Sequence, residues 1–487
     1  MSEERVATGV VGLDERIGGG LPKGSLTVVS GEPGSGKTTF CAKFAHYGAS
    51  ELHDPSVYVS FGESRKVFYS NMQLLGLNFE ECEQSFKYLD FVRMKGGAEE
   101  ILTIIIKELE QTNARRLVID SFTTLCQTIK DASEQPVVMD TILSKIMRGM
   151  GCTTILTVEK NYGQPWLGSG FEAFVADGII FLERDEESGI RMMKIPKLRG
   201  TKLPQTRFLC SLHNGFRLIP PLGPTKLLVS DRNVSDSKLA GSFKRPWTPA
   251  PGTQTRFSTG NMELDNIANR GFERGAYVVL EVERDVPPRA VKSLTYPLMW
   301  NFLSQGHGVL CYLGQNTSGE EIKAIASSYV SSKTFDKLVR VFEDNPHRST
   351  IHPYIVPLRG GKQDLDHEAE LFHTTSHKLM KMTRKNVLSI ISYADLENKY
   401  AGNIEQLFSH IGDSIGHNMS SGNVTLAIAR PGLAITEKVL NITRWHLKLI
   451  ERDGAVLFYG VRPRISLHAV DIDESGDQVK MRLTPML

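Results

Sequence analysis

Long apolar runs are missing from this sequence of 487 residues. Runs such as residues 102–106 and 277–280 fall far short of the roughly 20 residues that a membrane helix needs. The first residues, MSEERVATG, are polar and acidic, without the apolar segment of a secretory signal. The sequence therefore predicts a cytoplasmic protein without a membrane span.

Cysteine is scarce, and neither sign of charge is in large excess. The six cysteines form no C-x-x-C pair, which excludes a disulfide or zinc framework and is typical of a reducing cytosol. The 57 Lys and Arg residues nearly balance the 55 Asp and Glu residues, for a net charge of +2. We therefore do not expect this chain to bind nucleic acid or an anionic membrane by bulk charge.

What is present is an ordinary globular composition. Hydrophobic residues make up 40% of the chain and charged residues 23%, which excludes wholesale disorder and fibrous repeats. The length is too great for one ordinary core and suits two domains of the usual size. We therefore expect a two-domain globular protein.

The strongest local signal is GEPGSGKT at residues 31–38, which satisfies the pattern G-x-x-x-x-G-K-[ST]. A short β-branched segment precedes it at 25–30, and apolar residues at helical spacing follow it over 39–49. A strand, a glycine-rich turn and a helix form the arrangement that a phosphate-binding loop requires. The motif therefore predicts an ATP or GTP site.

Each residue of this loop has an expected part in binding phosphate. The glycines allow a sharp turn, so that backbone N–H groups converge on the β-phosphate. The Lys37 ammonium would reach the β- and γ-phosphates, and the Thr38 hydroxyl would be a Mg²⁺ ligand. The expected nucleotide-binding residues are Gly31, Glu32, Pro33, Gly34, Ser35, Gly36, Lys37, Thr38 and Thr39.

Two carboxylates follow expected buried strands further along the chain. Asp120 ends the segment RLVID, where it would hold Mg²⁺ beside Thr38. Glu63 follows the segment VYVSF, where a carboxylate can orient the attacking water. The alternative for Glu63 is a charge at the start of the helix that Ser64 begins.

Strand and helix patterns alternate over the first half of the chain. Expected strands lie at 57–61, 89–93, 118–120 and 153–158, with expected helices at 99–111 and 134–150. This alternation predicts an α/β fold with a mostly parallel sheet and helices on both faces. Three later segments, at 178–183, 190–196 and 206–210, predict an antiparallel edge.

The stretch TGVVGLDERIGGGLPKGSLTVVSGEPGSGKT at residues 8–38 resembles the start of a KaiC-type domain of the RecA superfamily. Three later segments agree with it in order: VYVSFGES at 57–64, RRLVIDSFTTL at 115–125, and GFEAFVADGIIFLERD at 170–185 followed by KLRGTK. The resemblance covers about residues 5–220. It implies a RecA-like ATPase core that forms rings, commonly hexamers, with ATP held between neighbouring subunits.

The resemblance also implies residue roles. The family's K-x-R-G segment supplies cations to the γ-phosphate of the next subunit, and Lys197 and Arg199 match that segment. From charge alone, the same pair would be solvated surface cations. Family members usually carry two adjacent acidic residues after the second strand, where this sequence has Gly62 and Glu63. The missing carboxylate calls rapid hydrolysis into question but not nucleotide binding.

An internal repeat relates the two halves of the chain. A shift of 251 positions aligns seven identities within 21 positions without a gap, beginning with Thr8 and Thr259. The chain is therefore predicted to be a tandem duplication with a Pro-rich linker between the copies. The expected domains are residues 1–221 and 257–487, and the expected linker is 222–256.

The second copy lacks the residues of the phosphate loop. At the same shift, Pro288 replaces Lys37, and Pro287 beside it removes a further N–H donor. Ser392 stands where the first copy has Asp120, if the apolar segments are aligned. The second domain is therefore predicted to be degenerate, a pseudo-ATPase kept for packing, ring formation or partner binding.

Together these features favour a KaiC-like regulatory ATPase whose first domain binds ATP with Mg²⁺, hydrolyses it slowly and acts through a partner that the sequence does not identify. The alternative is an ATP-gated regulatory scaffold that does not hydrolyse ATP. A recombinase-like ATPase on DNA is a third hypothesis, against which the near-neutral charge argues. Within the KaiC-like group, one intact copy followed by a degenerate one is similar to the archaeal gas-vesicle regulatory proteins of the D type.

Overall fold

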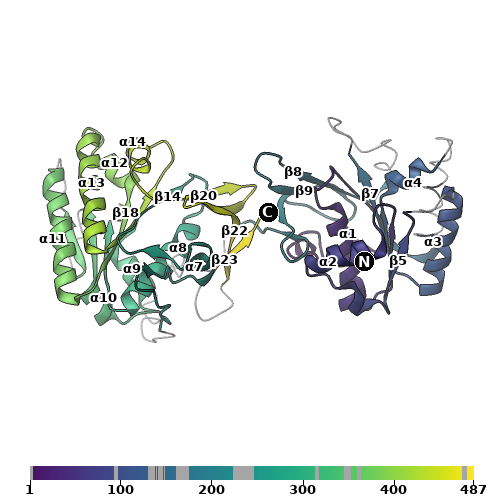
Figure 1. Ribbon diagram of the computed structural model, residues 1–487, viewed down its shortest axis with the longest axis horizontal. Coiled ribbons are helices and arrows are strands. Elements are labelled where there is room, and N and C mark those ends of the chain that lie inside the picture. The colour runs from purple at the N-terminus through teal and green to yellow at the C-terminus, as the bar shows by residue number, and fades with distance from the viewer. Residues whose placement is uncertain are drawn as a thin grey trace. The chain divides into compact units, whose positions relative to one another are not determined.

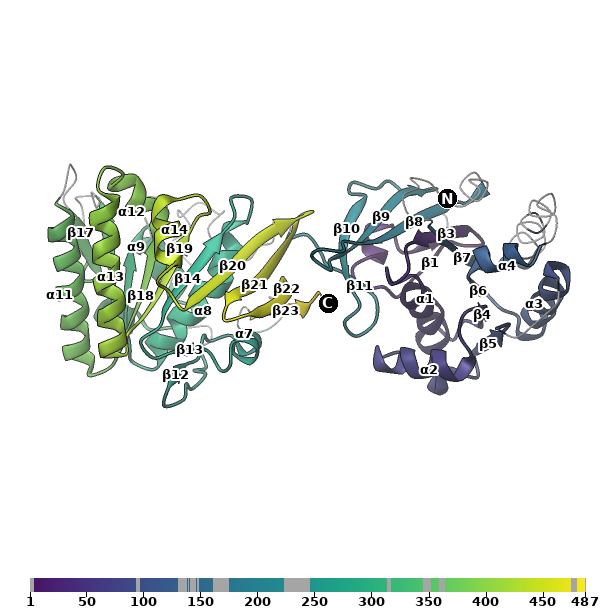
Figure 2. The same ribbon diagram turned by 45° about the horizontal axis from the view of Figure 1, so that its top comes forward.

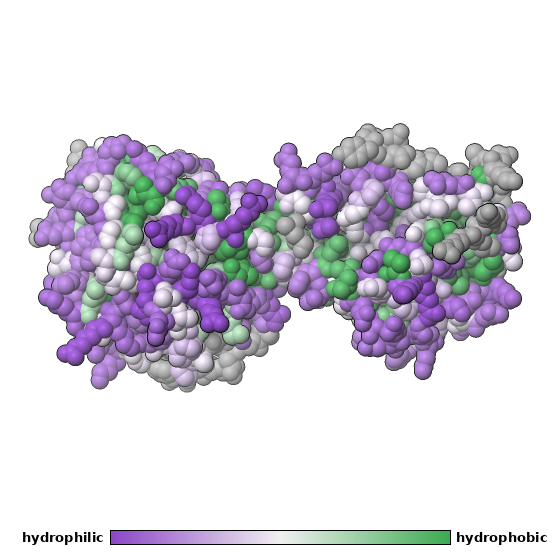
Figure 3. All heavy atoms as spheres, viewed as in Figure 1, coloured by the Kyte–Doolittle hydropathy of each residue, from purple (hydrophilic) through white to green (hydrophobic). Residues whose placement is uncertain are grey.

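The computed structural model divides the chain into two compact units, Met1–Pro220 with Pro485–Leu487 and Pro221–Thr484 (Figure 1). No helix in the described part of the chain has both the length and the apolar character to cross a membrane. Hydrophilic residues dominate the face of each unit seen in Figure 3, and the hydrophobic patches between them are small. The described residues are 4–92, 97–129, 138, 140, 146, 149–160, 175–222, 246–312, 317–344, 352–358, 364–473 and 480–486.

The first unit is built on a nine-stranded sheet with the order β11-β10-β9-β8-β3-β7-β6-β4-β5. Neighbouring strands from β8 to β5 are parallel, and β9, β10 and β11 form an antiparallel edge beside β8. The predicted α/β fold with an antiparallel edge is confirmed. The strands are β3 (Leu26–Gly31), β4 (Ser56–Ser60), β5 (Phe86–Asp90), β6 (Arg116–Asp120), β7 (Thr153–Glu159), β8 (Gly178–Arg184), β9 (Arg191–Leu198), β10 (Arg207–Ser211) and β11 (Arg217–Leu218).

Helices cover both faces of this sheet. Helices α1 (Lys37–Glu51) and α2 (Arg65–Leu74) belong to one core, and α3 (Ala98–Thr112) and α4 (Phe122–Gln127) to the other. Because side chains alternate along a strand, β3 directs Val29 to the α1 core and Val28 to the α3 core. Strand β3 is buried along its whole length, as its β-branched sequence predicts.

The second unit has a ten-stranded sheet with the order β17-β16-β15-β18-β19-β14-β20-β21-β22-β23. Its neighbouring strands are parallel from β17 to β20, and β21 and β22 then pair antiparallel. The strands are β14 (Tyr277–Val282), β15 (Gly308–Tyr312), β16 (Val339–Asp344), β17 (Ile355–Leu358), β18 (Val387–Ser392), β19 (Val424–Ala429), β20 (Trp445–Arg452), β21 (Ala455–Arg462), β22 (Ile465–Asp473) and β23 (Lys480–Pro485).

Helices again lie on both faces of the second sheet. One core contains α7 (Met262–Ile267), α8 (Pro288–Ser304), α9 (Gly319–Ala326) and α10 (Ser332–Leu338). The other contains α11 (Leu365–Thr383), α12 (Tyr393–Lys399), α13 (Ile404–Ser421) and α14 (Ala434–Leu440). Figures 1 and 2 show α11 and α13 side by side along this second face.

The two units share one topology. Strands β20, β14, β19, β18, β15 and β16 follow the same order as β8, β3, β7, β6, β4 and β5, and β17 adds one strand at that edge. The shift of 251 positions relates β3 to β14 and the start of α1 to the start of α8. It also relates two side-chain clamps: Asp14 accepts hydrogen bonds from the backbone and hydroxyl of Thr8, and Asp265 accepts the same pair from Thr259.

Part of the expected linker packs against the second unit. The side chain of Trp247 is only 7% exposed and meets the Tyr329 ring edge-on, with the centroids 5.9 Å apart. The backbone N–H of Ala250 donates to Asn301 Oδ1 at 2.8 Å. A large aromatic side chain thus anchors this Pro-rich segment. Residues 223–245 of the expected linker and most of the expected helix at 134–150 lie outside the described residues.

Candidate functional site

The turn between β3 and α1 contains the glycine-rich loop. Gly34 and Gly36 have φ angles of +76° and +105°, a backbone conformation that favours glycine. Gly31 is required for space, because a Cβ there would lie 2.2 Å from the carbonyl oxygen of Leu182. The loop leads directly into α1, whose N-terminal backbone N–H groups have no side-chain cap. This geometry suits an anion such as phosphate.

Lys37 is the first residue of α1, and its ammonium lies across the loop. Its Nζ donates to the carbonyl oxygens of Gly31 at 2.7 Å and Glu32 at 3.1 Å. Burial lowers the pKa of Lys37, whereas the carboxylates of Glu159 and Asp120 raise it. A cation is therefore held within the loop, at the position where an anionic ligand would be bound.

Asp120 ends β6, which β7 separates from β3 in the sheet. Its Oδ2 accepts hydrogen bonds from the hydroxyls of Thr38 at 2.8 Å and Tyr58 at 2.7 Å. Its Oδ1 accepts from the hydroxyl of Thr157 at 2.6 Å. Three hydroxyls, from α1, β4 and β7, thus orient one carboxylate. A hydroxyl beside a carboxylate at the mouth of the loop is a donor set that fits Mg²⁺.

Two of these hydroxyls were not predicted from the sequence. Burial raises the pKa of Tyr58 well above its usual value, and the nearby Asp120 raises it further, so the phenol remains a neutral donor. Tyr58 and Thr157 each carry a polar group within an otherwise buried strand, a signal that the sequence does contain. Only the order and register of the strands reveal that both groups meet at Asp120.

Glu63 leaves the same edge of the sheet as Asp120, because β4 and β6 are adjacent parallel strands. The Glu63 backbone is fixed: its N–H donates to Ser60 Oγ at 3.2 Å, and its carbonyl accepts from the Tyr88 hydroxyl at 2.8 Å. The half-buried carboxylate accepts a long hydrogen bond of 3.5 Å from Asn71. The structure therefore fixes the backbone more firmly than the carboxylate.

Lys197 and Arg199 lie at the end of β9, on the antiparallel edge. Lys197 pairs in register with Ile179 of β8. Arg199 is joined to Asp177 through its backbone N–H and through Nη1, each at 2.9 Å, and its side chain remains 61% exposed. Within the first unit, Arg199 is thus bound to Asp177 rather than to the glycine-rich loop.

Three further charged residues lie around the loop and were not predicted. Glu159 ends β7, pairs in register with Gly31 and raises the pKa of Lys37. Lys160 lies 3.6 Å from the carboxylate of Glu32. Arg191, at the start of β9, donates from Nε to the carbonyl oxygen of Gly34 at 3.4 Å. Applying to β7 the strand-end argument used for Asp120 would have identified Glu159.

The equivalent edge of the second unit has different chemistry. Pro288 begins α8, where Lys37 begins α1. Ser392 ends β18 and pairs with Ile428 of β19, the strands equivalent to those that bring Asp120 and Thr157 together. The hydroxyl of Ser392 donates to Asp395 on α12. The groups that surround Asp120 in the first unit thus have no equivalent at this position of the second.

Comparisons with known proteins agree with this geometry. A family model described as "ATPase: KaiC" matches residues 6–238, and one described as "GvpD basic region 2" matches residues 246–353. The chain is 32% identical to the UPF0273 protein of Thermotoga maritima over 222 residues, which cover 41% of this chain and 88% of that protein.

Two further relatives match longer parts of the chain. Protein GvpD2 of Halobacterium salinarum is 22% identical over 500 residues, which cover 95% of this chain and 94% of that protein. The circadian clock oscillator protein KaiC of Prochlorococcus marinus is 29% identical over 300 residues, which cover 58% of this chain and 54% of that protein. The similarity to GvpD2 therefore spans both units.

The space around two glycines gives a prediction for stability. We expect Gly31→Ala to destabilise the protein by about 2 kcal/mol, because its methyl group would overlap the Leu182 carbonyl oxygen. The matched control is Gly62→Ala, where a Cβ meets no atom within 4 Å, and its expected effect is within about 0.5 kcal/mol. Urea unfolding measures both variants. Equal midpoints for the two variants would contradict the close approach at Gly31.

Proposed function

The chain belongs to the KaiC-type ATPase family, and from that premise we propose that its first unit binds ATP with Mg²⁺ and hydrolyses it slowly. The observation that carries this proposal is the 2.8 Å hydrogen bond between the Thr38 hydroxyl and the Asp120 carboxylate beside the glycine-rich loop. It unites the first turn of α1 with the tip of β6, as a site for a metal-bound nucleotide requires.

The loop residues Gly31 to Thr39 would bind the phosphates through backbone N–H groups and the Lys37 ammonium. Thr38 and Asp120 would hold Mg²⁺, which neutralises charge on the phosphate oxygens when it is bound. The hydroxyls of Tyr58 and Thr157 hold Asp120 in one orientation, since each donates to a different carboxylate oxygen. The metal site is therefore preorganised by the protein.

Hydrolysis would need two further contributions. Glu63, beside Asp120 at the same edge of the sheet, would orient the attacking water. Lys197 and Arg199 would supply cations to a nucleotide bound by a neighbouring copy of the chain, as their family motif implies. The exposed position of Arg199, directly after β9, is compatible with such a contact. The proposal therefore includes a homo-oligomer, with a ring as its expected form.

We assign the second unit, from residue 257 onward, a regulatory rather than a catalytic role. Prolines at the loop and Ser392 at the strand tip leave it without an equivalent of Lys37 or Asp120. It keeps the topology of the first unit, so its surface remains available for packing between subunits or for binding a protein partner. This division of roles is that of a tandem protein with one ATPase unit and one pseudo-ATPase unit.

The second candidate function is an ATP-gated scaffold that binds nucleotide without hydrolysing it. Gly62 favours this candidate, because it stands where relatives of the KaiC type usually carry a second carboxylate. In that case the presence or absence of bound ATP, rather than its hydrolysis, would switch the protein between regulatory states. Binding to DNA has weaker support, since the net charge of the chain is only +2.

The rate of phosphate release distinguishes the two candidates. We expect Glu63→Gln to lower steady-state phosphate release at least about tenfold, because the amide cannot accept a proton from water. ATP binding, measured by calorimetry with Mg²⁺, is expected to stay within about twofold of the wild type, because the loop is intact. Glu83→Gln, an exposed carboxylate beyond α2, is the matched control. Equal background rates in the wild type and Glu63→Gln would instead favour the scaffold.

The missing carboxylate generates a second prediction. We expect Gly62→Glu to increase phosphate release several-fold, because it restores the acidic pair in a position with open space around it. Gly62→Gln introduces the same bulk without the charge and is expected to leave the rate unchanged. If both variants hydrolyse ATP at the wild-type rate, Gly62 is not what limits hydrolysis.

The assignment of Arg199 to a neighbouring subunit is tested by mixing variants. We expect Arg199→Ala and Lys37→Ala each to lose phosphate release, for lack of the cation and of the phosphate ligand respectively. An equal mixture should recover about one quarter of the wild-type rate, since random assembly pairs an intact loop with an intact Arg199 at that frequency. Native mass spectrometry with ATP and Mg²⁺ should report a multiple of 54.2 kDa. A mixture that stays inactive, or a mass of one chain, would exclude the shared site.

A further inference from the structure

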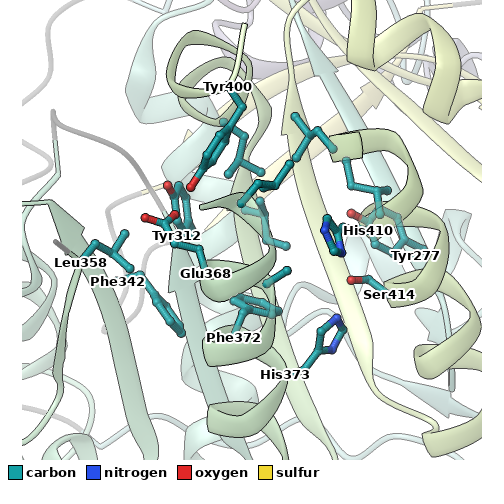
Figure 4. A pocket seen from close by; sticks show the side chains of 16 residues that line it. Tyr277, Tyr312, Phe342, Leu358, Glu368, Phe372, His373, Tyr400, His410 and Ser414 are labelled. Carbon is teal, nitrogen blue, oxygen red and sulfur yellow. The ribbon is translucent and has the colours of Figure 1, made fainter. Parts of the chain in front are cut away.

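The second unit contains a pocket between its sheet and the helices α11 and α13 (Figure 4). Strands β15, β16 and β18 contribute to its floor through Tyr312, Phe342 and Ile391. The pocket and its open mouth together contain about 620 Å³ of atom-free space.

The pocket is not a remnant of the lost nucleotide site. Tyr277 lines it, whereas the next residue along β14, Val278, belongs to the core that contains α8. Because successive side chains of a strand point to opposite faces, the sheet lies between the pocket and α8. Helix α8 follows the degenerate loop, so the pocket lies on the other face of the sheet from that helix.

Most of the pocket wall is apolar. Phe342, Leu358 and Ile391 come from the sheet, and Phe372 and Leu407 come from the helices. Such walls favour an aromatic or alkyl group over a charged one, because a charged group would lose its hydration without gaining partners.

One end of the pocket gathers a carboxyl group and two phenols, whereas His373, His410 and Ser414 line its other side (Figure 4). Figure 4 shows the side chains of Glu368, Tyr312 and Tyr400 converging there from α11, β15 and the end of α12. Their exposed fractions are 6%, 8% and 5%, so all three are more than nine-tenths buried. One oxygen of Glu368 accepts a hydrogen bond of 2.7 Å from Lys399, which also binds Asp344.

Three polar atoms at this end make no well-aligned hydrogen bond. Among the described residues, neither the second oxygen of Glu368 nor the hydroxyls of Tyr312 and Tyr400 have a hydrogen-bond partner in good geometry, although the Tyr400 hydroxyl lies close enough to Glu368 for their interaction to raise the pKa of Tyr400. Another tyrosine of the pocket differs, since the Tyr277 hydroxyl is paired with Tyr393 at 2.7 Å. Buried polar groups without partners are costly, and here three of them meet at one end of a cavity.

The charge state of these groups restricts the ligand. Burial, and then the proximity of Glu368, raise the pKa of both Tyr312 and Tyr400, so both phenols stay neutral and can donate hydrogen bonds. A carboxylate or phosphate would be repelled by Glu368. An ammonium ion would find only one unpaired carboxylate oxygen at this end and would lose its hydration among apolar walls.

We propose that this pocket binds a small uncharged molecule with an apolar body and one hydroxyl group, a phenol or an alcohol. A hydroxyl can donate to the free oxygen of Glu368 and accept from the two tyrosines at the same time. The apolar body would lie against the apolar wall that includes Ile391 and Leu407. The unpaired polar atoms of Glu368, Tyr312 and Tyr400 would then each gain a partner.

Among its described residues, the first unit has no equivalent of Tyr312. Tyr312 pairs with Ile391 one residue before the tip of β18, and Val59 pairs with Ile119 one residue before the tip of β6. A valine thus stands where the second unit has the Tyr312 phenol. The proposed site belongs to the second copy alone and is independent of ATP hydrolysis in the first.

Calorimetry with the full-length protein and two matched probes tests the proposal. We expect 4-ethylphenol to bind at one site per chain and ethylbenzene about tenfold more weakly, because it lacks the hydroxyl. The anion 4-ethylbenzoate is expected not to bind. Equal affinities for 4-ethylphenol and ethylbenzene, or the absence of 4-ethylphenol binding, would overturn the proposal.

Variants of the polar end test the roles of the tyrosines. The double variant Tyr312→Phe with Tyr400→Phe should lower the preference for 4-ethylphenol over ethylbenzene several-fold, leaving only the contribution of Glu368, while binding of ethylbenzene stays unchanged. The matched control is Tyr296→Phe on α8, which removes another buried hydroxyl that lacks a hydrogen-bond partner among the described residues and does not line this pocket. An unchanged preference for 4-ethylphenol in the double variant would refute the assignment.

Variants that fill the pocket test its location. Ala369→Phe on α11 and Ser414→Phe on α13 each place a ring at a position that lines the pocket, on two different helices, and each should abolish binding of both probes. Met419→Phe adds an aromatic ring at an exposed position of α13 and should leave binding unchanged. Thermal unfolding shows whether each variant folds. If one of the two filling variants does not fold, the binding measurement on the other one tests the location of the site. If a folded filling variant still binds 4-ethylphenol, the binding site lies outside this pocket and the proposal is overturned.

Discussion

The carboxylate of Asp120 is the group on which the arrangement of the first unit's site depends. A carboxylate at this depth requires hydrogen-bond donors, and it receives them from Thr38, Tyr58 and Thr157. Because these donors belong to α1, β4 and β7, one charge fixes the start of the helix relative to three strands of the sheet. The glycine-rich loop is therefore held at both ends, by β3 before it and through Thr38 after it.

The second unit shows that the fold does not need this charge. Ser392 and Ile428 stand where Asp120 and Thr157 meet, so the carboxylate and one of its donors are replaced together. A hydroxyl has no role where the carboxylate is missing, and an apolar side chain then fits a buried strand better. The shared topology depends instead on alternating apolar strands and on local clamps such as that of Asp265. The charged cluster around Asp120 and the fold are thus separable in this chain.

The same distinction explains what the sequence could predict. The strand, loop and helix around Gly31 were expected at 25–30, 31–38 and 39–49, close to the observed β3 and α1, because each depends on a local pattern. The partners Tyr58 and Thr157 depend on which strands become neighbours, and that is decided by contacts far apart in sequence. The polar end of the pocket is even harder to predict from the sequence, since three elements that are far apart in the chain contribute one side chain each.

Each unit has a cluster of polar side chains that a ligand could contact, but the two clusters lie at different places on the sheet. In the first unit these groups gather at the carboxyl ends of the strands, beside a loop that suits an anion. In the second, Glu368, Tyr312 and Tyr400 gather under the helices, at the end of an apolar pocket. A duplicated fold can change its ligand in this way, because successive residues of a strand face opposite sides of the sheet. Residues on one face can therefore change while those on the other face keep the core intact. On the two proposals, ATP would bind to the first unit and a neutral apolar molecule to the second.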